Sequence, residues 1–163
     1  MTVAPRARRR VRTAIRSRWD ILLVIAVGGA LGSLARWGLT LALPHPVGAF
    51  PWATFDANVS GCLLIGLLMV VVLDVLPPHR HLRPFLGVGV LGGFTTFSTY
   101  MLDARALLAA GRPGTAAAYL FGSLAAGLTA VWLGVTLARL AVRTARQTRA
   151  GTAGHTRESR SPE

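Results

Sequence analysis

The chain has 163 residues, of which 52% are hydrophobic and only 15% are charged. Soluble domains usually carry about 25% charged residues, so this composition excludes an ordinary soluble enzyme. The formal net charge of +12 comes from 18 basic residues, all of them arginine, against six acidic residues. Residues 1–20 hold seven of these arginines and residues 139–163 hold six, whereas residues 21–138 hold only five. A nearly uncharged centre with basic ends predicts insertion into a membrane and argues against binding to nucleic acid.

Four apolar stretches follow one another along the centre of the chain, and each reaches the roughly 20 residues that a helix needs to cross a bilayer. They lie at about 21–43, 53–76, 85–110 and 115–138. The linkers between them are rich in proline or glycine, which is typical of helix ends. The first stretch could be a signal peptide, but the three spans that follow it favour a retained membrane helix.

We therefore expect an all-α membrane protein with three parts. A basic tail occupies residues 1–20, a four-helix transmembrane domain occupies residues 21–138, and a basic, polar tail occupies residues 139–163. The composition of the C-terminal tail is typical of a disordered segment.

The residues that commonly bind metals are few. The single cysteine, Cys62, excludes an intramolecular disulfide and a cysteine-rich zinc site, and its apolar surroundings predict a small buried residue. Two histidines, His79 and His81, are close enough in sequence to touch one metal, but two ligands make a weak site. We expect all four histidines to be residues of linkers or of the tail: His45, His79, His81 and His155.

The third stretch contains the string GVGVLGGFTTFSTYMLD at residues 87–103. Two adjacent glycines followed by two adjacent threonines are poor helix formers, so this string predicts a break or a kink. Carbonyls that a break frees at membrane depth must be buried in protein, reach water or coordinate an ion. A hard cation such as Na⁺ suits carbonyl oxygens. The pattern alone leaves a kinked, glycine-rich helix equally open.

At residues 92–100 the sequence GGFTTFSTY resembles the broken-helix signature of the Fluc (CrcB) family of fluoride channels. Further segments are similar to family motifs in the same order: GGALGSLARWGL at 28–39, TFDANVSGCLLIG at 54–66, and Tyr119 with Ser123 in the fourth stretch. The resemblance covers about residues 21–138. It implies a passive, fluoride-selective channel that exports cytoplasmic fluoride and reduces its toxicity. It also implies a third helix broken at GGFTT and an antiparallel dimer with two pores.

The resemblance implies roles for individual residues as well. Residues implied to form the fluoride pore are Asn58, Phe97, Tyr100, Ser98, Thr99, Thr54, Tyr119 and Ser123. The backbone carbonyls of Gly92 and Thr95 are implied to bind a central Na⁺, which is structural and not transported. Arg36 matches the arginine of the family's first helix.

The residue types in this set suit a small anion. Fluoride enters a dry pore only where hydrogen-bond donors replace its water, and amide and hydroxyl groups donate without a fixed charge. A fixed cation would hold the ion too tightly, whereas conduction requires the ion to leave. The ring edge of Phe97 is weakly positive and can face an anion. Thr54 and Asn58 lie four residues apart on one helix face, as do Tyr119 and Ser123.

Four positions depart from the family pattern. Tyr100 adds a hydroxyl where a second phenylalanine is usual, Asp103 replaces a frequent glutamate, and Gly127 carries no hydroxyl. Asp56 is an acid within a membrane span. Because an acid beside an anion route would repel the ion, we expect Asp56 to lie off the pore face.

Two other functions stay open on the residues alone. A small four-helix, proton-coupled exporter of cationic drugs needs a carboxylate inside its first helix. That stretch has Arg36 and no acid after Asp20, which counts against an exporter. A membrane scaffold without transport has no need for a donor-rich broken helix.

The arginine distribution predicts an orientation. Four spans place both termini on one side, which would carry fifteen arginines against three at most on the other side. Thirteen remain after Arg157 and Arg160 are discounted as too distant from the last span. We therefore expect a multi-pass protein of the cell (inner or plasma) membrane with both termini in the cytoplasm. This bias favours one fixed orientation and a heterodimer with a homologous subunit of opposite bias, and a homodimer is the alternative.

Overall fold

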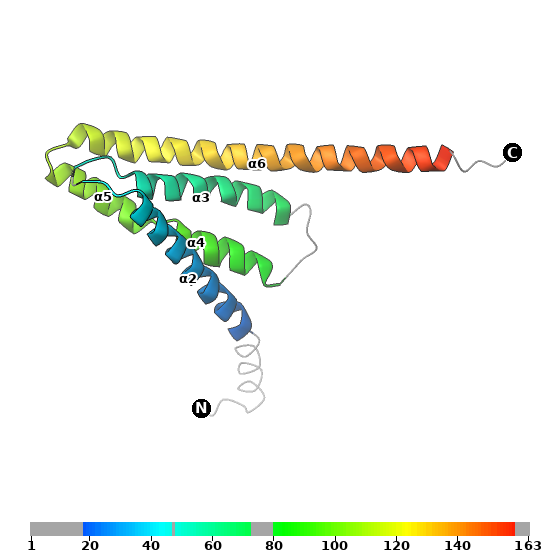
Figure 1. Cartoon of the computed structure of the whole chain (residues 1–163), viewed down its shortest axis with the longest axis horizontal. Coiled ribbons are helices and arrows are strands. Elements are labelled where there is room, and N and C mark those ends of the chain that lie inside the picture. Colours follow the sequence, from blue (N-terminus) through cyan, green and yellow to red (C-terminus); the bar gives the residue numbers. More distant parts are fainter. Residues whose placement is uncertain (1–17, 47, 73–79, 159–163) are drawn as a thin grey trace, which may run out of the picture.

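The computed structural model describes residues 18–46, 48–72 and 80–158, and within these residues the chain is helical and has no strand (Figure 1). The elements are α2 (Trp19–Ala42), α3 (Trp52–Val70), η2 (Pro84–Val90), α4 (Leu91–Phe94), α5 (Phe97–Ala109) and α6 (Pro113–Glu158). The segment η2 is a short π-helix that continues directly into α4. Four spans are long and apolar enough to cross a membrane: Trp19–Ala42, Trp52–Val70, Pro84–Ala109 and Pro113–Ala145. The predicted all-α, multi-pass membrane fold is confirmed.

The spans pack as two pairs. Helices α3 and α6 run side by side, and α2 crosses the η2–α4 half of the third span (Figure 1). The start of α2, the far end of α3 and the extended end of α6 point away from the end where the 43–51 and 110–112 linkers lie (Figure 1). The membrane-spanning part of the chain therefore has two distinct ends.

Backbones touch directly where α2 crosses η2 and α4. A Cβ atom added at Gly32 would lie 2.0 Å from the Val90 carbonyl oxygen. One added at Gly93 would lie 2.3 Å from the Gly29 carbonyl oxygen. Small residues allow this close approach in membranes, where dispersion contacts hold helices together.

The pair α3–α6 has a similar contact at the level of Gly66 and Gly134. A Cβ at Gly66 would lie 2.5 Å from the Val131 carbonyl oxygen, and one at Gly134 would lie 2.4 Å from that of Leu63. Toward the start of both helices, the pair encloses a small core with α5. This core consists of Ala104, Leu107, Ala116 and Tyr119.

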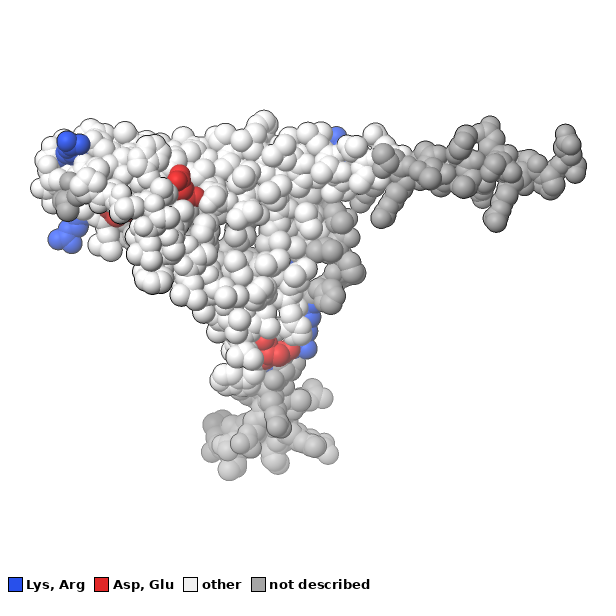
Figure 2. Space-filling model, viewed as in Figure 1, with Lys and Arg blue, Asp and Glu red and all other residues white. Residues whose placement is uncertain are grey.

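The surface between the two ends carries few charges, and large apolar side chains cover it (Figure 2). Such a surface suits lipid tails. At the start of α2, the Asp20 carboxylate accepts a hydrogen bond from Arg80 at 3.2 Å and lies 2.8 Å from His81 Nε2. His81 is thus a linker residue that pairs with an acid, and His79 lies outside the described residues.

Two boundaries differ from the sequence-based ones. Helix α3 ends at Val70, and the predicted end of the second stretch near residue 76 lies outside the described residues. Helix α6 does not end at Ala138 but continues to Glu158, into the segment predicted to be a disordered tail. Alanine, leucine, arginine and glutamine dominate residues 138–150, and these are good helix formers. The N-terminal tail lies outside the described residues up to position 17.

Candidate functional site

The third span is broken at two threonines. Helix α4 ends at Phe94, and Thr95 and Thr96 adopt extended backbone with ψ angles of 156° and 129°. Helix α5 then starts at Phe97, where the Thr96 hydroxyl accepts a hydrogen bond of 3.2 Å from the Thr99 N–H. Threonine at this position is a common helix cap, because its oxygen satisfies an N–H that has no partner in the first turn. The predicted break at GGFTT is therefore confirmed.

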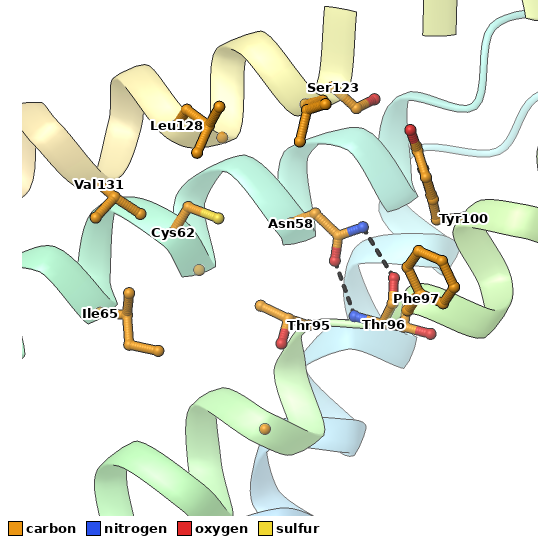
Figure 3. A pocket seen from close by; sticks show the side chains of 14 residues that line it. Asn58, Cys62, Ile65, Thr95, Thr96, Phe97, Tyr100, Ser123, Leu128 and Val131 are labelled. Carbon is orange, nitrogen blue, oxygen red and sulfur yellow. Dashed lines mark hydrogen bonds between the residues drawn. The ribbon is translucent and has the colours of Figure 1, made fainter. Parts of the chain in front are cut away.

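Asn58 of α3 holds the break from one side. Its Nδ2 donates to the Thr96 carbonyl at 3.0 Å, and its Oδ1 accepts from the Thr96 N–H at 2.8 Å (Figure 3). One side-chain amide thus satisfies both polar groups of a residue that has left the helix. This pairing keeps polar backbone at membrane depth from remaining without partners.

Arg36 of α2 holds the break from the other side. Its Nε donates to the Gly93 carbonyl at 3.2 Å, and its Nη1 donates to the Thr99 hydroxyl at 3.4 Å. The Ser33 hydroxyl also donates to the Gly93 carbonyl, at 3.4 Å. The guanidinium therefore joins the last turn before the break to the first turn after it.

Two carbonyls at the break lose their usual helical donors. In a continuous helix the Thr96 N–H would bond to the Gly92 carbonyl, and the Thr99 N–H to that of Thr95. Here these N–H groups donate to Asn58 and to the Thr96 hydroxyl instead. Among the described residues no three histidine, cysteine or acidic side chains gather as metal ligands. The oxygens at this break that suit a hard cation are therefore backbone carbonyls.

A groove of about 560 Å³ lies between α3, α6 and the break. It brings together six of the residues that sequence analysis named: Asn58, Gly92, Thr95, Phe97, Tyr100 and Ser123 (Figure 3). No charged side chain lines it. Its polar groups are amides, hydroxyls, a thiol and backbone, and its remaining walls are apolar, so the groove can offer donors without a fixed charge.

The two aromatic residues after the break have different surroundings. Phe97 is 75% exposed, and its ring centroid lies 5.9 Å from that of Tyr100. The Tyr100 hydroxyl donates to the Leu120 carbonyl of α6 at 2.6 Å. The Tyr100 hydroxyl thus links α5 to α6 and does not point free into the groove.

The other named residues lie outside the groove. Tyr119 is fully buried between the helices, and its hydroxyl lies 3.4 Å from an Asp103 carboxylate oxygen. Thr54 is buried near the start of α3. Ser98 is exposed and contacts the Thr96 hydroxyl at 3.2 Å, and Thr99 faces Arg36.

Sequence analysis missed two residues of the site. Thr96 is the centre of the break, and its place before a helical segment is the signal of a capping residue. Cys62, expected to be simply buried, lines the groove and is half-buried. Its signal was the four-residue spacing from Asn58, which places both on one face of α3.

Comparison with known proteins identifies the family of the chain. Residues 23–135 match the family model described as CrcB-like protein, Camphor Resistance (CrcB). The chain is 51% identical over 128 residues to Fluoride-specific ion channel FluC 1 of Streptomyces coelicolor, covering 78% of this chain and 83% of the relative. It is 52% identical over 127 residues to Fluoride-specific ion channel FluC 2 of Nocardia farcinica, covering 78% and 91%. The family model covers well over half of the sequence, and the chain belongs to the CrcB family.

Proposed function

We propose that the chain is a passive fluoride channel, not an enzyme, and that it lets cytoplasmic fluoride leave the cell and so reduces its toxicity. The observation that carries this proposal is the uncharged, donor-bearing groove beside the broken third span. The relatives are named fluoride-specific ion channels, and these names support fluoride as the ion that this chain conducts.

The chemistry of the groove supports a small, strongly hydrated anion. Asn58 Nδ2 has two N–H groups, and Thr96 takes one of them. The Ser123 hydroxyl is a second donor, and the exposed ring of Phe97 offers its edge. Neutral donors replace water around the ion and still allow it to leave.

We also propose that Na⁺ binds at the break as a structural ion that is not transported. The carbonyls of Gly92 and Thr95 support this role, because both have lost their helical donors. When bound, the cation would stabilise backbone oxygens that point away from the helix ladder.

The proposed assembly is an antiparallel dimer. One chain leaves the groove open and Phe97 exposed, and both features suit a second subunit that closes the route. The excess of arginine at one end favours a heterodimer with a homologous subunit of opposite bias, with both termini of this chain in the cytoplasm.

Cysteine accessibility tests the orientation. We expect a T2C variant to be protected from an impermeant thiol reagent outside intact cells and an R112C variant to react, both in a Cys62→Ser background. Equal labelling of both variants from outside would contradict one fixed orientation and favour the homodimer.

Fluoride efflux tests the channel itself. Purified protein is reconstituted in liposomes loaded with fluoride or chloride, alone and with a homologous subunit, and efflux is followed with ion-selective electrodes. We expect fluoride efflux far above that of protein-free liposomes and little chloride efflux. Absence of fluoride efflux in both preparations, or equal chloride efflux, would overturn the proposal. A proton-coupled exporter of cations would instead acidify or alkalinise the lumen when a cationic substrate is added.

A further inference from the structure

Two rows of residues run along α3 and α6, and their third members, Cys62 and Gly127, face each other across the pair. On α3 the row is Thr54, Asn58 and Cys62, and on α6 it is Tyr119, Ser123 and Gly127. Each row has a spacing of four residues, which keeps its members on one helix face. Every member carries a polar side chain except Gly127, so the row on α6 has no donor at its third position.

The Cys62 thiol fills the space beside this glycine. A Cβ atom added at Gly127 would lie 3.3 Å from Cys62 Sγ, and apart from the neighbouring turns of α6 itself no other described residue comes within 4 Å of it. Both residues line the groove, and Figure 3 shows the thiol of Cys62 pointing into it from α3. The absence of a side chain on α6 therefore leaves room for a sulfur atom from α3.

An independent observation indicates a ligand at this level of the groove. Ser123 lies one helical turn before Gly127 and is only 9% exposed. Its hydroxyl is the only buried side-chain oxygen or nitrogen in the described part of the chain that has no hydrogen-bond partner. A buried hydroxyl without a partner is unfavourable, so it marks a place where a ligand or a water accepts its hydrogen bond.

We propose that the Cys62 thiol is the next donor after Ser123 in the ion route and replaces the donor that Gly127 lacks. The inference rests on the proposed fluoride channel and deepens it. The S–H group is a weak, uncharged donor, so it can contact the ion without trapping it. The same position makes Cys62 a site where a small thiol reagent obstructs the route.

The first experiment uses methyl methanethiosulfonate, because Cys62 is the only cysteine. The Cys62 thiol loses its proton to water, and the thiolate attacks the sulfenyl sulfur of the reagent. A disulfide to the methylthio group forms, the S–S bond of the reagent breaks, and methanesulfinate leaves with the electron pair. We expect fluoride efflux to fall at least about tenfold, a rise of about 1.4 kcal/mol in the barrier, and to recover after dithiothreitol.

The matched control is Cys62→Ser, whose treated and untreated samples should have equal efflux. Complete modification of the wild-type chain, measured by mass spectrometry, with unchanged efflux would overturn the inference. A second readout does not depend on conduction: fluoride should slow the modification of Cys62 relative to an equal concentration of gluconate. An equal rate in both anions, or no modification at all, would overturn the inference. Absent efflux before treatment would instead contradict the proposed function.

A double substitution separates a donor from a space-filling atom. We expect Cys62→Ala to lower efflux severalfold, and Cys62→Ala with Gly127→Ser to restore most of it by moving a hydroxyl to the opposite helix. Unchanged efflux in the single variant would show that the thiol is only packing. A loss that Gly127→Ser does not restore would contradict the role as donor.

Discussion

The two packed pairs of this molecule use glycine in different ways. Where α2 crosses η2 and α4, glycines on both sides bring backbone against backbone at successive turns, as at Gly28, Gly32, Gly89 and Gly93. In the α3–α6 pair the backbones touch at the level of Gly66 and Gly134, and the groove opens at other levels. Where a glycine faces the backbone of another helix, the two backbones touch and no space remains. Where a glycine faces a side chain, as Gly127 faces Cys62, that side chain decides the chemistry of the space.

The polar groups of the two pairs differ in the same way. Arg36, the charged residue between α2 and the third span, donates to Gly93 and Thr99 and so serves the structure. The groove beside α3 and α6 contains only neutral donors, and the Ser123 hydroxyl there has no partner among the described residues. The first pair is a support for the break, and the second leaves the groove to which we assign the ion route.

The largest effect is expected from adding a side chain where α2 crosses η2 and α4. Gly32→Ala places a Cβ 2.0 Å from the Val90 carbonyl oxygen, and backbone cannot move aside as a side chain can. Overpacking costs about 1–3 kcal/mol or more, so we expect loss of monodisperse protein in size-exclusion chromatography.

The matched control for that substitution is Gly38→Ala on the same helix, where an added Cβ meets no described residue within 4 Å beyond the neighbouring turns of α2. It should purify as the wild-type protein does. If Gly32→Ala also purified normally and conducted fluoride, the contact between α2 and the third span would not be the rigid support described above.

A smaller but functional loss is expected from Asn58→Ala. The substitution leaves the N–H and carbonyl of Thr96 without their partners, each at a cost of about 1–3 kcal/mol, and removes a donor from the groove. We expect efflux to fall at least about tenfold while the protein remains assembled. Wild-type efflux from a correctly assembled variant would exclude a role for Asn58 in the route.

Exchange of Na⁺ tests the carbonyls at the break. We expect efflux to fall when Na⁺ is replaced completely by N-methylglucamine and to recover when Na⁺ returns, because backbone oxygens of Gly92 and Thr95 would lose their cation. An imposed Na⁺ gradient should not drive fluoride uphill. Full efflux after rigorous exchange would show that the site is wrongly assigned.

The side chain of Thr95 should matter less than its carbonyl. Its hydroxyl donates to the Leu91 carbonyl of its own helix at 2.8 Å, and its methyl group packs near Gly61. Thr95→Val keeps the methyl group and removes one local hydrogen bond worth about 1 kcal/mol. We expect Na⁺ dependence to persist in this variant, and its disappearance would indicate that the hydroxyl is a ligand.

The smallest effect is expected at Tyr100. Tyr100→Phe keeps the ring beside Phe97 but removes the hydrogen bond to the Leu120 carbonyl. A loss of about 1 kcal/mol should lower the melting temperature in detergent by a few degrees. Efflux should change little, and a large change would mean that the hydroxyl contacts the ion.

The sequence predicted the features that depend on local composition. Four apolar stretches became four spans, and the poor helix propensity of GGFTT predicted the break at Thr95 and Thr96. It did not predict that the Asn58 amide pairs with the backbone of Thr96, because that contact joins residues 38 positions apart and depends on how α3 lies against the third span. The burial of Tyr119 beside Asp103 is likewise a product of packing.

The end of α6 was missed for a different reason. Hydropathy falls after Ala138, and that fall marks the end of the most apolar stretch, not the end of the helix. Residues with high helix propensity continue the backbone pattern to Glu158 without help from lipid.

The position of the groove along α6 indicates its depth in the bilayer. At about 1.5 Å per residue, its 46 residues extend about 69 Å, more than twice the roughly 30 Å of hydrocarbon. Helix α6 starts at Pro113, and Arg139 is its first charged residue. The Arg139 guanidinium therefore marks the level of the lipid headgroups. Measured back along the helix axis from that level, Gly127 lies at about 18 Å and Ser123 at about 24 Å, whereas the midplane lies at about 15 Å. The thiol of Cys62 thus lies near the bilayer midplane, where water is scarcest and an anion depends most on the protein for its hydrogen bonds.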